Sequence, residues 1–117
     1  MDWHDYAIPM TWGPDVEEHD MVAQRCLVWE GKYNLYSALF RMPKGGIFDE
    51  HTHPDWIQTV VLEGQLKVET KKDGTRLIGP GECYIIEPDE LHIESAVEDT
   101  LVLITKPEDR EEFMSKD

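Results

Sequence analysis

The sequence predicts an all-β domain, either an antiparallel sandwich or a barrel. Roughly eight to ten short segments rich in aliphatic, β-branched and aromatic residues follow one another at regular spacing. Turn-forming residues separate them, as in Gly79-Pro80-Gly81. The chain has 117 residues and no internal repeat, which is enough for one domain with its own core. We expect an N-terminal arm over residues 1–22, a barrel over 23–106 and a tail over 107–117.

The first half of the barrel is expected to contain three strands and the segment that matters most for function. Residues 24–30 and 33–42 are rich in aliphatic and aromatic side chains, and Gly31-Lys32 forms the turn between them. Residues 43–46 (PKGG) then break the chain before a segment with two histidines. Residues 57–62 (IQTVVL) form the next strand, which Glu63-Gly64 ends.

The second half begins with a hairpin. Residues 66–71 alternate between apolar and charged side chains, Asp73-Gly74 is a preferred pair for a type I′ turn, and residues 75–78 return. The last strands are expected at residues 83–86, 91–95 and 100–105. The tail is compatible with a short helix that begins at Pro107.

Composition limits the partners. The net charge of −14 argues against nucleic acids and anionic membranes, which both require basic surfaces. No export signal or membrane-spanning run is evident, so we expect a cytoplasmic protein. Cys26 and Cys83 are therefore not expected to form a disulfide, and Cys83 is expected to be buried. The arm is irregular but carries Trp3 and Trp12, so it should pack on the barrel or on a second subunit, which predicts a homodimer.

His51 and His53 lie at positions i and i+2. On an extended strand such side chains share a face, so two imidazoles could bind one ion. A third ligand must come from elsewhere in the fold, and His92 is the candidate.

These segments resemble the two signature motifs of the cupin superfamily. Gly45, His51, His53 and Gly64 are in register with the first motif, and Gly81 and His92 mark the ends of the second. The resemblance implies a jelly-roll barrel and a metal site, and small cupins are usually dimers. Pro88 falls one place after the family proline, and Glu87 and Asp89 replace the proline and glycine of the second motif. Aspartate tolerates the left-handed backbone conformation that this turn requires.

The glutamate ligand of the family is missing. Depending on the spacing chosen, its position holds Ile57, which cannot bind a metal, or Gln58, which is a weak candidate ligand. The expected site is therefore three histidines with one divalent transition metal ion, which could be iron, zinc or nickel, with manganese less suited to imidazole ligands.

Three functions follow as hypotheses. The first is an Fe(II) dioxygenase that acts on a small oxygenated or carboxylated metabolite, since the three-histidine pattern resembles that of thiol and diketone dioxygenases among the cupins. The second is a Lewis-acid isomerase, epimerase or lyase that acts on a sugar acid. The third is a non-catalytic module that binds or senses a small molecule.

Two further residues are candidates for the same pocket. Glu94 lies two residues after His92 and so on the same face of a strand, where it could serve as a general base or orient a ligand. Trp56 lies beside the first motif and could form an aromatic wall for the substrate, or belong to the core or a dimer contact.

Overall fold

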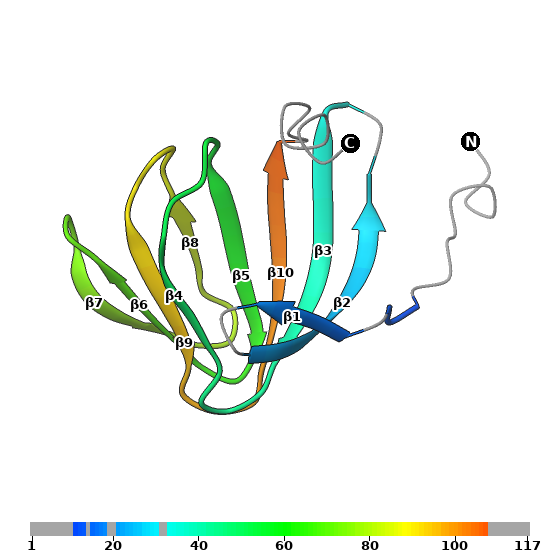
Figure 1. Ribbon diagram of the computed structural model, residues 1–117, viewed down its shortest axis with the longest axis horizontal. Coiled ribbons are helices and arrows are strands. Elements are labelled where there is room, and N and C mark those ends of the chain that lie inside the picture. The colour runs from blue at the N-terminus through cyan, green and yellow to red at the C-terminus, as the bar shows by residue number, and fades with distance from the viewer. Residues whose placement is uncertain (1–10, 14, 19–20, 31–32, 108–117) are drawn as a thin grey trace.

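The computed structural model describes residues 11–13, 15–18, 21–30 and 33–107, and these residues form ten strands (Figure 1). In chain order the strands are β1 (Asp15–Glu18), β2 (Met21–Trp29), β3 (Leu35–Met42), β4 (Ile47–His51), β5 (Ile57–Glu63), β6 (Leu66–Thr70), β7 (Gly74–Ile78), β8 (Cys83–Ile86), β9 (His92–Ala96) and β10 (Thr100–Pro107).

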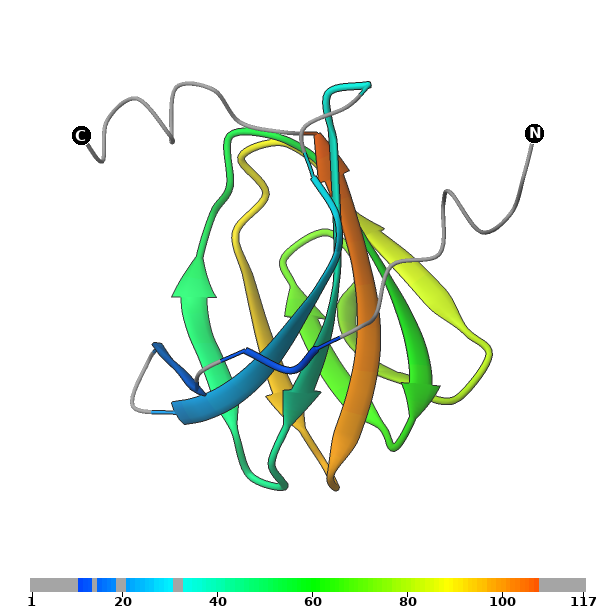
Figure 2. The ribbon, with the colours of Figure 1, turned by 90° about the vertical axis from the view of Figure 1, so that its right-hand side faces the viewer.

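The strands form two antiparallel sheets. One has six strands in the order β1-β2-β3-β10-β5-β8, and the other has four in the order β4-β9-β6-β7. Figure 2 shows β4 and β9 on one side of the molecule and β5, β8 and β10 on the other. Strands that are distant in sequence are therefore neighbours, as in a jelly roll, and the predicted all-β barrel is confirmed.

The core lies between the two sheets. Val61, Leu66, Val68 and Ile86 are almost completely buried, and side chains from both sheets complete the cluster. On β6 the buried positions alternate with half-buried ones, as the sequence pattern predicted. No helix among the described residues is long and apolar enough to cross a membrane.

Three local predictions need correction. The hairpin between β6 and β7 has three loop residues, 71–73, and Gly74 takes the positive φ, so the two-residue type I′ turn is wrong. Cys83 is exposed, because Tyr84 and Ile86 are the residues of β8 that face inward. Pro107 ends β10 and does not begin a helix, and residues 108–117 lie outside the described residues.

The arm also contains a strand that was not predicted. Its residues 15–18 form β1, which pairs with the beginning of β2 at the edge of the six-stranded sheet. The guanidinium of Arg41 lies 3.8 Å from the centroid of the Trp12 ring, so this tryptophan packs on the barrel as expected. Trp3 lies outside the described residues.

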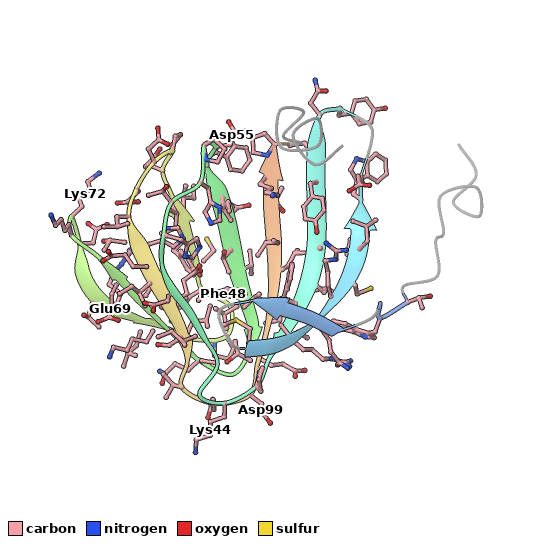
Figure 3. All side chains as sticks on the ribbon, in the orientation of Figure 1. Lys44, Phe48, Asp55, Glu69, Lys72 and Asp99 are labelled. Atoms are coloured by element: carbon pink, nitrogen blue, oxygen red, sulfur yellow. The ribbon has the colours of Figure 1, made fainter. Side chains whose placement is uncertain are left out.

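Two connections lie at opposite ends of the barrel. Figure 3 shows Asp55, between β4 and β5, at one end and Asp99, between β9 and β10, at the other. At the Asp99 end, Gly64 has a φ of 87°, and a Cβ there would collide with the backbone of Asp99 and Thr100. This glycine is therefore required by close backbone approach as well as by its conformation.

Candidate metal centre

The register of β4 and β9 brings the predicted ligands together. His51 and His92 are direct cross-strand partners, and a bulge in β4 between Phe48 and His51 sets this pairing. His53 follows the end of β4, and its ring centroid lies 4.6 Å from that of His51 and 5.1 Å from that of His92. One nitrogen from each of the three imidazoles lies within 4.8 Å of the others. The predicted convergence of His51, His53 and His92 is confirmed.

Backbone contacts hold this arrangement. The amide of Asp89 donates to the carbonyl of His53 over 2.7 Å, which ties the turn before β9 to the segment after β4. Asp89 has a φ of 60°, so the left-handed conformation predicted for this turn is confirmed. The substitution of aspartate for the family glycine is therefore compatible with the site.

Backbone carbonyls orient the rings of two of the histidines through their Nδ1 atoms. Nδ1 of His51 lies 2.6 Å from the carbonyl of Asp49, and Nδ1 of His92 lies 2.8 Å from the carbonyl of Glu90. Because a carbonyl oxygen only accepts, each Nδ1 carries the proton, and the lone pair of each neutral ring is on Nε2. This is the usual support for a metal-binding histidine.

The residues present fit a metal ion. His92 is 1% exposed, and its Nε2 is buried with no hydrogen-bond partner. A buried polar atom without a partner is costly, and a cation shared with the other two imidazoles would satisfy it. Oε1 of Glu94 lies 3.5 Å from this nitrogen, too far for a good hydrogen bond.

The pKa values of His53 and His92 are shifted in opposite directions. Burial, together with the nearby His51 and His92, lowers the pKa of His53 to about 4, so this ring is neutral near pH 7. Burial also tends to lower the pKa of His92, but the Glu94 carboxylate and the hydrogen bond to the Glu90 carbonyl outweigh it and raise that pKa. In the metal-free protein, His92 is therefore the site at which a proton competes best with a cation.

Glu94 faces the same site. It lines the cavity beside the histidines, and the hydroxyl of Tyr84 donates to its Oε2. Burial alone would raise the pKa of Glu94, but His92 and the Tyr84 hydroxyl lower it, so the carboxylate is ionised. Burial and the Glu94 charge raise the pKa of Tyr84 well above its ordinary value, which keeps the hydroxyl protonated.

Two other sequence candidates are not brought to the site. Ile57 and Thr59 line the cavity and Gln58 between them does not, so strand alternation places Gln58 on the opposite face of β5 and does not support it as a ligand. Ile57 thus occupies the inward position near the histidines. Trp56 is half-buried before β5 but is not among the residues that line the cavity, so the expected aromatic wall is not formed by this residue.

A cavity of about 470 Å³ opens beside the histidines. Phe40, Met42, Phe48 and Ile104 provide apolar walls. This volume lies in the range typical of small-molecule sites.

Besides Thr59, the sequence analysis missed three polar residues of the cavity wall. They are Arg25 on β2, Tyr36 on β3 and Lys106 on β10, each far from the two motifs. The available signal was strand phase, since Lys106 follows Val102 and Ile104 at two-residue intervals and so shares their inward face. A cation on the inward face of a barrel strand is unusual enough to mark a candidate site.

Comparison with known proteins agrees with this geometry. The family model for the ChrR cupin-like domain matches residues 9–109. Among solved structures, KdgF from a Halomonas species has a TM-score of 0.72 and 25% identity, over 88% of this chain and 92% of that one. An RmlC-like cupin from Desulfovibrio desulfuricans has a TM-score of 0.60 and 26% identity, over 72% and 80% of the two chains.

A more distant likeness supports the fold alone. A structure described under DMSP lyases RdDddP and RnDddQII has a TM-score of 0.71 but only 13% identity, over 84% of this chain and 56% of that one. No curated protein matches the sequence with significance. Because the family model covers most of the sequence and the fold is shared with many cupin structures, this chain belongs to the ChrR cupin-like family of the cupin superfamily.

Proposed function

We propose that this protein is a metal-dependent enzyme that acts on a small oxygenated or carboxylated metabolite. His51, His53 and His92 would hold one divalent transition metal ion at the wall of the cavity. The observation that carries the proposal is the buried Nε2 of His92, which has no hydrogen-bond partner and lies beside two further imidazoles.

The donor set selects among metals. Three neutral imidazoles suit iron, zinc and nickel, whereas manganese prefers more carboxylate and carbonyl ligands. When bound, the ion would act as a Lewis acid on a carbonyl or carboxylate of the substrate, and iron would add redox chemistry with dioxygen. No carboxylate takes the position of the family glutamate, because Ile57 is the residue of β5 that faces inward there.

Among the reaction classes, the geometry best supports proton transfer of the isomerase, epimerase or lyase type. Glu94 is an ionised carboxylate that faces the cavity, and the Tyr84 hydroxyl fixes its orientation. Such a group can accept a proton from a substrate carbon next to a polarised carbonyl or carboxylate. The C–H bond breaks and its electron pair moves onto that neighbouring group. In an isomerase or epimerase, Glu94 then returns the proton to carbon. In a lyase, a β-substituent departs with its bonding electrons instead.

A dioxygenase is the second candidate. It is supported by the ligand set of three histidines without a carboxylate, the pattern seen in the thiol and diketone dioxygenases that the sequence resembles. The apolar walls formed by Phe40, Phe48 and Ile104 would exclude water in either reaction.

The deciding experiment begins with elemental analysis of protein purified without a chelator or a metal-affinity tag. Zinc- or nickel-loaded protein is then incubated in deuterated water, under strict anaerobiosis, with a panel of small hydroxy and keto acids. Proton-transfer chemistry predicts deuterium in recovered substrate or product, and Glu94→Gln should abolish it while metal content stays the same. Substrate-dependent oxygen uptake by the iron form, without exchange, would support the dioxygenase instead. Ligand-induced stabilisation without any turnover would favour a binding or sensing module.

We also propose that the protein forms a homodimer through the outer face of the six-stranded sheet. A row of apolar residues crosses four adjacent strands on this face: Leu39, Leu103, Val60 and Cys83. Leu62 and Ile85, on the same face, are 42% and 50% exposed. With a net charge of −14, two copies repel each other over most of their surface. We therefore expect the dimer contact at this uncharged row of residues.

A further inference from the structure

The cavity has a second polar region in addition to the metal centre. Arg25, Tyr36 and Lys106 line it from the six-stranded sheet, whereas the histidines come from β4, β9 and the segment after β4. Strands β2, β3 and β10, which carry these three residues, are adjacent in that sheet (Figure 1). The polar groups therefore belong to a different wall from the three imidazoles.

The three residues form one cluster. Tyr36 and Lys106 are cross-strand partners, and Nζ of Lys106 lies 5.3 Å from the centroid of the Tyr36 ring. Nη1 of Arg25 lies 3.5 Å from the hydroxyl of Tyr36. Tyr36, which is 8% exposed, therefore has Lys106 over its ring and Arg25 at its hydroxyl.

The charge of this cluster is unusual for the chain. There are 25 acidic residues and 11 lysines and arginines in the whole sequence, yet two of the cations line the same cavity. Among the described residues, no carboxylate forms an ion pair with Arg25. A cavity with this wall attracts anions into a protein that otherwise repels them.

We propose that Arg25, Lys106 and the Tyr36 hydroxyl bind a carboxylate group of the substrate. Arginine and a tyrosine hydroxyl donate hydrogen bonds to carboxylate oxygens, and lysine adds a compact positive charge. The apolar side chains of Phe40, Met42 and Ile104 line the same cavity and would contact the carbon chain. The end of the substrate opposite this carboxylate would then face the histidines and Glu94. This assignment rests on the proposed function for the reacting end, but carboxylate binding itself does not require the metal.

The test compares acids with their uncharged amides. Propionate, succinate, malate and glutarate, each paired with its amide, are titrated into zinc-loaded protein by isothermal calorimetry. We expect at least one acid to bind about tenfold or more tightly than its amide. In Arg25→Gln/Lys106→Gln this acid should lose about tenfold or more in affinity, while the affinity for the amide is unchanged.

A matched control removes the same charge elsewhere. Lys44→Gln/Lys72→Gln loses two exposed lysines outside the cavity (Figure 3) and should bind the acid as the unaltered protein does. The inference is overturned if no acid binds more tightly than its amide, or if the double variant of the cavity binds the acid normally. Measuring the metal content of each variant distinguishes failure of the carboxylate site from failure of the metal centre. Acid binding that depends on Arg25 and Lys106 in protein without stoichiometric metal would sustain this inference and refute the metal centre.

Discussion

Removal of two imidazoles should abolish metal binding without unfolding the barrel. His51 and His53 are half-buried and lie outside the core cluster, so His51→Ala/His53→Ala should cost the metal-free protein about 1 kcal/mol or less. His92 alone cannot retain a stoichiometric ion. The effect of metal on stability should therefore disappear.

The expected size of that effect follows from linkage. A ligand present at about 100 times its dissociation constant adds about 2.7 kcal/mol to the free energy of unfolding. In a domain of this size, 1 kcal/mol shifts the melting temperature by about 4 °C, so the metal should raise it by about 10 °C. Elemental analysis and thermal denaturation with and without zinc measure both quantities.

Thr52→Ala is the matched control, because Thr52 is exposed and lies between the two histidines. This variant should keep both the metal and the shift in melting temperature. Stoichiometric metal in the double variant, or an unchanged shift, would refute the assignment of these ligands. Loss of the metal from Thr52→Ala as well would point to a general distortion of the segment.

Four further predictions concern catalysis, pH, the backbone and assembly. Glu94→Gln should keep the metal but lower the turnover number by about 10²–10⁴-fold, measured under steady-state conditions; unchanged turnover would exclude a general base here. Zinc affinity should fall as pH is lowered, because the pKa of His92 is raised and its proton must leave before the metal binds; calorimetry in several buffers should detect proton release. Gly64→Ala should destabilise the protein by about 1–3 kcal/mol in urea denaturation, since its Cβ meets backbone atoms at positive φ. Ile85→Glu should convert a dimer to a monomer in sedimentation analysis, whereas Leu77→Glu, at a 56% exposed position of the other sheet, should not.

Much of the fold could be predicted because the strands carry their own signals. The alternation of β6 matches its burial, and turn residues mark most connections. The i, i+2 spacing of His51 and His53 could also be interpreted locally, and the shared phase of His92 and Glu94 placed both in the site correctly.

The errors arose where a strand is apolar on both faces or where phase depends on a distant pairing. Cys83 lies in such a strand, so composition could not show which face was buried. Gln58 and Ile57 were both compatible with the family spacing, and the sheet pairing of β5 decides which one faces inward. Arg25 and Lys106 have no local motif at all. Their common wall exists only because β2, β3 and β10 are adjacent in the sheet.

The most direct test of the metal centre is a crystal structure of the metal-loaded protein with data at the absorption edge of the bound ion. We predict one anomalous peak about 2.0–2.1 Å from one nitrogen of each of His51, His53 and His92. The proposal would be contradicted by a peak elsewhere, or by no peak and a hydrogen bond from Nε2 of His92 to Glu94.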